Sequence, residues 1–188
     1  MARPRSDDRR GAIMAAAIRI IAAQGLGAPT AMIAREAGVS NGSLFTYFET
    51  KADLLNRLYV ELKAEMVATA GDRLPANGEP RAQLLHLWSH WLRWAAADPD
   101  KRWTLAQLDV SDVITAESHR AVRDAFADIR ALLERSREGG PLRDLPLEYV
   151  AALLSALAEA TIDCTIRDPA RADLYRAEGF GALWRMIT

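Results

Sequence analysis

The sequence predicts an all-α protein of about nine helices, arranged as a small N-terminal bundle and a larger C-terminal one. Apolar residues recur every three or four positions along most of the chain, which is the spacing of one helix face. No segment shows the alternation that is typical of a β-strand. Half of the 188 residues are hydrophobic, so the chain can bury a substantial core.

The first helix is predicted for residues 6–25. Ser6 can cap its N-terminus, and Asp7 and Asp8 lie in the first turn, where negative charge favours the helix dipole. Gly25 suits the end of the helix. The expected buried stripe consists of Ile13, Ala17, Ile20 and Ile21.

Two short helices joined by a tight turn are predicted for residues 29–37 and 41–48. Pro29 suits the first position of a helix because its missing N–H would be unpaired there anyway. Gly38 can adopt the left-handed conformation that ends a helix, and Ser40 can cap the next one. Together these residues predict a helix-turn-helix.

The second of these helices is expected to point Leu44, Phe45 and Phe48 inward. Its other side carries small or hydrogen-bonding residues, namely Asn41, Gly42, Ser43, Thr46 and Tyr47. A solvated helix would more usually carry Lys and Glu there, whereas short polar side chains suit a flat surface rich in donors and acceptors. In DNA-binding helix-turn-helix proteins, the second helix lies in the major groove. A helical hairpin used only for packing is the alternative.

A long helix is predicted for residues 50–71, with Thr50 as its cap and Asp53 in a capping-box position. Its apolar face comprises Leu55, Leu58, Leu62 and Met66. Residues 71–80 form a loop by composition. Helices follow at residues 81–97, 101–110, 115–137 and 147–166, and the last one begins at residues 168–169.

The apolar faces of these later helices follow the same spacing. The inward side at residues 81–97 is expected to contain Leu84, Leu85, Trp88, Trp91 and Leu92. The helix at residues 101–110 carries Trp103, Leu105 and Leu108. The stripe at residues 115–137 consists of Val122, Phe126, Ile129 and Leu133, and that of the last helix of Phe180, Leu183, Trp184 and Ile187.

The run IAREAGVSNGSLFTYFETKADLL resembles the DNA-binding helix-turn-helix of the tetracycline-repressor (TetR) family of bacterial transcription regulators. Many residue types match at fixed spacing, which is more specific than a short motif. The strong resemblance covers residues 25–55, and beyond them only size, helix number and helix order are similar. It implies a DNA-binding domain at residues 1–50, with its helix-turn-helix at about 29–48, and a ligand-binding and dimerisation domain at 51–188.

The resemblance also implies roles for individual residues. Base-reading positions fall on Asn41, Gly42, Ser43 and Thr46, and phosphate contacts on Thr30, Ser40, Tyr47 and Lys51. Phe45 belongs to the same predicted contact set, but it stands where the family usually has a tyrosine whose hydroxyl could bond phosphate. Ala31 stands where some members carry an arginine able to reach bases. Arg3 and Arg5 form an arm that either reaches the DNA or is a frayed terminus.

We expect a homodimer, because two-fold pairs place two reading helices in successive major grooves. The resemblance implies an intermolecular four-helix bundle made from the last two long helices. Gly179 and Gly181 could allow close approach there, or they could only bend the final helix. The function implied is that of a repressor that binds a palindromic operator and is released by a small molecule.

Four of the five tryptophans lie between residues 88 and 103. Apolar pockets between bundle helices are common small-molecule sites. The predicted ligand-binding residues are Trp88, Trp91, Trp103 and Gln107. A plain tryptophan core is the alternative.

Charge and composition bear on the class of protein. Residues 1–60 carry eight Lys/Arg against five Asp/Glu, a balance of +3, whereas the remainder carries sixteen against twenty, a balance of −4. The single cysteine fits a reducing cytoplasm. The sequence contains no uninterrupted run of about eighteen apolar residues, which a membrane-spanning helix would need. We therefore expect a cytoplasmic protein whose partners are double-stranded DNA, a small-molecule effector and a second copy of itself.

Two other classes of protein are possible alternatives. An enzyme or metal site could use His86 and His90 with Cys164, but no catalytic glutamate or nucleophile pattern accompanies them. We therefore expect no enzyme activity, no metal and no cofactor. The second rival is a helical interaction adaptor that has lost DNA binding.

Overall fold

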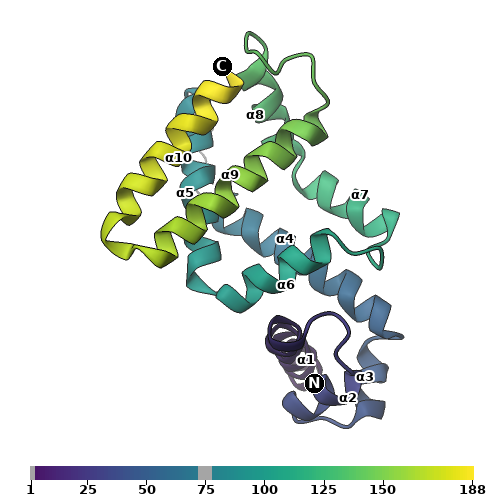
Figure 1. Ribbon diagram of the computed structural model, residues 1–188. Coiled ribbons are helices and arrows are strands. Elements are labelled where there is room, and N and C mark those ends of the chain that lie inside the picture. The colour runs from purple at the N-terminus through teal and green to yellow at the C-terminus, as the bar shows by residue number, and fades with distance from the viewer. Residues whose placement is uncertain (1–2, 72–77) are drawn as a thin grey trace. The chain divides into compact units, whose positions relative to one another are not determined.

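The computed structural model describes residues 3–71 and 78–188, with the side chains of residues 3–6 and 69–71 left undescribed (Figure 1). All regular secondary structure in these ranges is helical, which confirms the all-α prediction. The helices are α1 Arg3–Gln24, α2 Thr30–Glu36, α3 Asn41–Tyr47, α4 Lys51–Gly71, α5 Pro80–Ala97, α6 Pro99–Asp109, α7 Ala116–Ala125, α8 Ala127–Arg137, α9 Leu147–Arg167 and α10 Ala172–Ile187, with the 3₁₀ turn η1 Pro169–Arg171 before α10.

Two predicted features fall at the edge of the described residues. The loop predicted for residues 71–80 lies mostly outside them. The helix α1 begins at Arg3 rather than at Ser6, but the side chains of the predicted Arg3–Arg5 arm lie outside the described part.

The chain divides into two compact units. The first contains Met1–Ala64 and Asp98–Val122, and the second contains Glu65–Ala97 and Arg123–Thr188. The first unit therefore joins the predicted helix-turn-helix to α6 and most of α7, which come much later in the chain.

In the first unit, α1 packs against α2 and α6. Its buried residues are Ile13, Met14, Ala16, Ala17 and Ile21. Two side chains of α6 hold it to α1: the Thr104 hydroxyl donates to the Ile18 carbonyl at 3.1 Å, and the Gln107 amide donates to the Ile21 carbonyl at 3.4 Å. Thr104 is fully buried, so its hydroxyl needs this partner.

The start of α4 is capped much as predicted. The Asp53 N–H donates to the Thr50 hydroxyl at 3.0 Å, and the Asp53 carboxylate accepts from the Glu49 N–H at 3.1 Å. Leu54, Leu55, Leu58 and Leu62 are buried along this helix. Because α4 follows α3 after only three residues, this cap also fixes where α3 ends.

In the second unit, α5 packs against α8, α9 and α10, and α9 packs against α10. The Trp88 indole N–H donates to the Arg176 carbonyl at 3.1 Å. A Cβ added at Gly179 would lie 2.6 Å from the Thr161 hydroxyl and 2.9 Å from the Trp88 ring. The close approach expected of Gly179 between subunits is therefore made within one chain. At Gly181, a Cβ would approach only Arg185 of the same helix.

Three predicted details of the helices after α4 are wrong. The helix predicted at 115–137 is interrupted at Phe126, which has φ −96° and ψ 8°. A one-residue interruption leaves the apolar spacing intact, so the pattern could not reveal it. Leu85 is 39% exposed because the buried stripe of α5 runs through Leu84, Trp88, Leu92 and Ala95. Trp103 is 60% exposed because α6 buries Thr104, Leu105 and Leu108 instead.

Among the described residues, α9 is long and apolar enough to cross a membrane by length and composition alone. The core helix of a soluble protein can have the same length and composition. Glu148, Ser155 and Glu159 interrupt its apolar residues, so the sequence contains no long apolar run there. Val150, Ala158 and Ile162 of this helix are buried, and it packs against α5 and α10.

Candidate nucleic-acid interface

The turn between α2 and α3 depends on Gly38. Its φ is +68°, a left-handed conformation that costs glycine almost nothing and other residues considerably more. The Gly38 N–H donates to the Arg35 carbonyl at 3.1 Å, and the Val39 N–H donates to the Ala34 carbonyl at 2.9 Å. Ile33 and Ala34 are buried on the inner side of α2. The turn thus fixes the direction in which α3 leaves α2.

The N-terminus of α3 is capped by Ser40. Its hydroxyl oxygen accepts the Ser43 N–H at 3.0 Å, as the sequence predicts. Further along, the Thr46 hydroxyl donates to the Gly42 carbonyl at 3.3 Å. A Cβ added at Gly42 would meet only the Ser40 hydroxyl, at 4.0 Å. Packing within the chain therefore does not require glycine there. Because Gly42 has no side chain, the backbone of α3 is uncovered at this position.

The two sides of α3 differ sharply in burial. Leu44 and Phe48 are fully buried, whereas Asn41, Gly42 and Thr46 are exposed. Ser43 and Tyr47 are half-buried.

Phe45 is 41% exposed, so the prediction that it points inward is wrong. A helix of seven residues buries only a narrow stripe, and Leu44 and Phe48, four residues apart, occupy it. Phe45 therefore lies with the polar residues of the outward side.

The remaining predicted contact residues flank α3. Thr30 is the first residue of α2 and Lys51 the first residue of α4, and both are half-buried. Ser40 is exposed next to α3. Ala31 and Arg35 on α2 are exposed as well. Hydroxyls and a lysine at helix N-termini are suited to phosphate oxygens, because the helix dipole and free N–H groups favour negative charge there.

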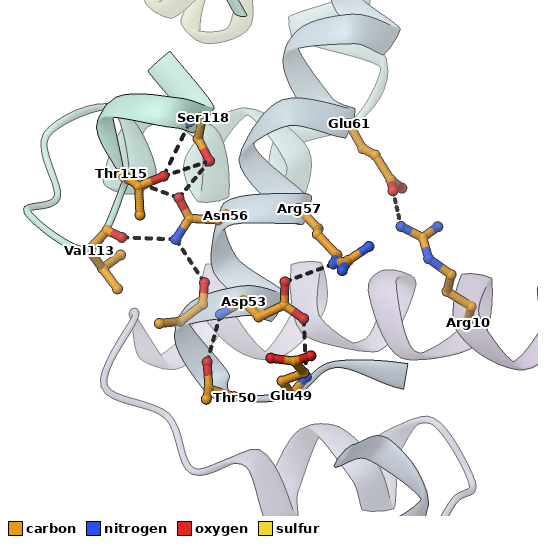
Figure 2. Close-up of polar contacts among 11 residues, drawn as sticks. Arg10, Glu49, Thr50, Asp53, Asn56, Arg57, Glu61, Val113, Thr115 and Ser118 are labelled. Carbon is orange, nitrogen blue, oxygen red and sulfur yellow. Dashed lines mark hydrogen bonds and ion pairs between the residues drawn. The ribbon is translucent and has the colours of Figure 1, made fainter. Parts of the chain in front are cut away.

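Ionic contacts join α1 to α4 and to α2, and a further one lies within α4. Arg10 pairs with Glu61 of α4 (Figure 2). Its guanidinium lies 5.7 Å from the centre of the Phe48 ring. Arg19 of α1 pairs with Glu36 of α2 at 2.8 Å. On α4, the Asp53 carboxylate accepts from Arg57 at 2.8 Å and raises the pKa of Arg57. Each pair is partly exposed and contributes only modestly to stability.

Asn56 of α4 was missed by the sequence reading. Its side-chain amide bonds Val113 and Thr115, which lie between α6 and α7, and Ser118 of α7, as Figure 2 shows. The only signal in the sequence is an asparagine beside the apolar face of a long helix. Its partners lie 57 to 62 residues away, so local patterns could not identify them.

The four predicted ligand-binding residues divide between the two units. Trp88 and Trp91 belong to the second unit, and Trp103 and Gln107 to the first. Trp88 is buried with its N–H satisfied, Trp91 is half-buried, and Gln107 is engaged with α1. A ligand-binding role for these residues stays a prediction.

The histidine pair weighed as a metal site lies on α5. The His86 and His90 rings are 4.2 Å apart between centroids. Cys164 is exposed on α9. Within the described ranges, no group of three or more His, Cys, Asp or Glu residues could hold a metal ion.

Comparison with known proteins places this surface in a family. Residues 13–58, which include α2, α3 and the start of α4, match the model of the TetR family of bacterial regulatory proteins. A protein from Shewanella sp. PV-4 assigned to the TetR family of transcription regulators is 27% identical, with 94% of this chain and 96% of that chain covered and a TM-score of 0.83.

Two further solved structures share the fold. A TetR family transcription regulator from Marinobacter aquaeolei VT8 is 19% identical, covers 98% of each chain and gives a TM-score of 0.86. The TetR-like regulator LfrR from Mycobacterium smegmatis, solved in complex with proflavine, is 19% identical and gives a TM-score of 0.69, with 96% of this chain and 98% of that chain covered. The similarity therefore extends over both units and is not limited to the helix-turn-helix.

Proposed function

We propose that the chain represses transcription by binding a palindromic operator as a homodimer, because residues 13–58 match the TetR family model and a TetR family regulator that is 27% identical shares the fold. In this proposal a small molecule that binds the second unit releases the protein from the operator. The observation that carries the proposal is the outward side of α3, which is mostly polar, carries no charged side chain and includes one exposed aromatic ring, that of Phe45, while Leu44 and Phe48 on the inner side are fully buried.

The chemistry of this side suits base reading. The major groove is about 12 Å wide and admits a helix. Asn41 is exposed at the first residue of α3, and an asparagine amide can pair bidentately with adenine. Gly42 keeps the backbone low, so the helix can approach the base edges. Ser43 and Thr46 add hydroxyls that can donate or accept.

Phosphate contacts would set the position of α3 in the groove. Thr30, Ser40, Tyr47 and Lys51 are the proposed residues, and all four lie on or next to α3 or at the first residue of a neighbouring helix. Such contacts carry no sequence information, but they fix register and orientation. Glu49 is exposed in the connection to α4, and its repulsion from phosphate would limit how deeply that end descends.

A second copy of the chain is the proposed partner for the exposed apolar side of α9 and α10. Tyr149, Ile166 and Leu174 are 52%, 47% and 54% exposed, and Ala152, Ala156 and Ala160 of α9 are also exposed. Exposed apolar surface of this kind is typical of interaction sites. One α3 contacts only a few base pairs, whereas a two-fold dimer reads two half-sites about 34 Å apart.

Effector binding is proposed for the second unit, with Trp88 and Trp91 as candidate contacts. The proflavine held by LfrR supports an effector role for this fold. Release is a shift in population between a conformation that binds DNA and one that does not. To empty a nearly full operator, the effector must bind the second conformation more tightly than the first by roughly 5 kcal/mol. We propose α4 as the element that transmits it, because α4 follows α3 directly and the boundary between the units falls within α4.

Selection of bound fragments from random duplex DNA tests the proposal. We expect a palindrome whose half-site centres lie about one helical turn, or a multiple of it, apart. Sedimentation of the complex should then give two chains, or a multiple of two, per duplex. A protein that enriches no sequence, and that binds no DNA from upstream of its own gene in a gel shift, would instead fit an interaction adaptor.

A further inference from the structure

The side chain of Asn56 uses its full hydrogen-bonding capacity. Its Nδ2 donates to the Ala52 carbonyl at 2.8 Å and to the Val113 carbonyl at 2.9 Å. Its Oδ1 accepts from the Thr115 N–H at 2.9 Å and from the Ser118 hydroxyl at 2.7 Å (Figure 2). An asparagine side chain offers two donors and an oxygen with two lone pairs, so no capacity is left over.

These bonds join two parts of the first unit that are far apart in sequence. Asn56 lies near the start of α4, just beyond the Thr50–Asp53 cap that follows α3. Its partners lie between α6 and α7 and in the first turn of α7. Ser118 is buried, and its N–H also donates to the Thr115 hydroxyl at 3.2 Å, so the receiving end is itself held in place.

The location of this tie matters because of how the chain leaves the first unit. The chain re-enters the first unit between Ala97 and Asp98, at the start of α6, and it leaves that unit within α4, between Ala64 and Glu65, and again within α7, between Val122 and Arg123. Asn56 links α4 to α7 at a point where both helices still belong to the first unit. Two further contacts lie nearby: the Tyr59 hydroxyl is 3.4 Å from His119 Nδ1, and Lys63 of α4 pairs with Asp109 of α6 at 2.8 Å.

We propose that Asn56 is a positioning residue for operator reading, which restricts the spacing between half-sites that the dimer accepts. This inference rests on the proposed function. A reading surface attached through one helix can pivot about it, whereas attachment through two helices tied together resists rotation. Inserting one base pair turns one half-site by roughly 35° relative to the other, and a dimer must pivot to follow that turn.

A purely structural role predicts a different result. If Asn56 only stabilised α4, its loss would lower the melting temperature and weaken binding to all spacings by the same factor. If it restricts the pivot, its loss weakens discrimination between spacings while the bases preferred within each half-site stay the same, because α3 itself is unchanged.

The test measures affinity for the selected palindrome and for versions with one or two base pairs inserted or removed between the half-sites. For the wild-type protein we expect a loss of roughly tenfold or more per base pair of change. For Asn56→Ala we expect roughly threefold or less, with an unchanged half-site preference. Ser118→Ala, which removes one of the amide's bonds, should shift the spacing profile in the same direction by less.

Arg57→Ala is the matched control, since it removes a hydrogen bond on the neighbouring residue that stays within α4. It should leave the spacing profile as in the wild type. The inference would be overturned if Asn56→Ala and Ser118→Ala weakened DNA binding equally at every spacing. It would also be overturned if Arg57→Ala changed the spacing profile as Asn56→Ala does. If Asn56→Ala unfolds, the milder Ser118→Ala decides the question. A wild-type protein that selects no palindrome overturns the proposed function itself, and with it this inference.

Discussion

Individual side chains of the α3 surface are expected to divide between reading bases and holding phosphates. Asn41 is exposed where an amide can reach a base edge, and Lys51 lies at the N-terminus of α4, where its charge suits a phosphate. Neither residue contributes to the buried core. Substituting each should therefore change DNA binding without changing the fold.

Asn41→Ala should change the preferred base at one position of each half-site and cost about 1–3 kcal/mol per half-site on the original operator. Lys51→Ala should weaken binding to operator and random DNA alike and reduce the dependence of log K on log salt by about two units, one for each subunit of the dimer. Titrations of both variants at several salt concentrations measure the two effects. Equal losses on operator and random DNA for both variants would contradict this division.

The exposure of Phe45 gives a second test at this scale. Leu44→Ala removes a fully buried side chain and should lower the free energy of unfolding by about 2–5 kcal/mol. Phe45→Ala removes a larger side chain that is 41% exposed, and it should cost clearly less. Chemical denaturation of the two variants makes the comparison. A larger loss for Phe45→Ala would restore the inward placement expected from the sequence.

Sequence periodicity identified most core residues but not the edges of the buried stripes. Leu44, Phe48, Trp88 and Leu92 were predicted inward and are buried. Phe45, Leu85 and Trp103 were also predicted inward and are exposed. Each lies next to a buried residue in the chain, and about 100° of helix rotation separates neighbours. Apolar character alone does not show which of two neighbours faces the core.

At the scale of elements, loops and caps were readable where one residue type is required. Gly38 and the Ser40 cap appear as predicted because few residues satisfy those positions. The loop between α8 and α9 is held by a contact with no local signature. The buried Arg137 donates to the carbonyls of Leu142, Arg143 and Leu145 at 2.6, 3.2 and 2.7 Å.

This loop supplies a prediction with an adjacent control. A Cβ added at Gly140 would lie 1.8 Å from the Ile187 carbonyl oxygen, whereas one added at Gly139 would meet nothing within 4 Å. The obstacle is backbone, and Arg137 holds the loop in place. Gly140→Ala should therefore lower the free energy of unfolding by about 1–3 kcal/mol or more. Gly139→Ala should change it by less than about 1 kcal/mol. Similar melting temperatures for the two variants would show that the loop yields at little cost.

At the scale of the whole molecule, the composition of the two units was not readable from the sequence. The first unit includes α6 because Thr104 and Gln107 bond carbonyls of α1 that lie 86 residues earlier. Hydrogen bonds over that separation leave no periodic signal. The helix-turn-helix was predictable because its residues are close together and each serves a local requirement. The contacts of Asn56 resemble those of α6 and were missed for the same reason.

The dimer is the remaining prediction at this scale, and a charge placed on α9 tests it. Ala156 is exposed on the apolar side of α9, so Ala156→Arg should leave the isolated chain folded while burying an unpaired charge in the proposed interface. Leaving a charge unpaired in an interface costs several kcal/mol, so the dimer dissociation constant should rise at least about 100-fold. Ala121→Arg, at an exposed position of α7, is the matched control and should remain dimeric.

Sedimentation velocity measures the association state of each variant. Gel shifts measure binding to the palindrome, and a monomer should bind the palindrome only as weakly as it binds a single half-site. If Ala156→Arg stays dimeric and binds the palindrome like the wild type, the subunits meet through another surface.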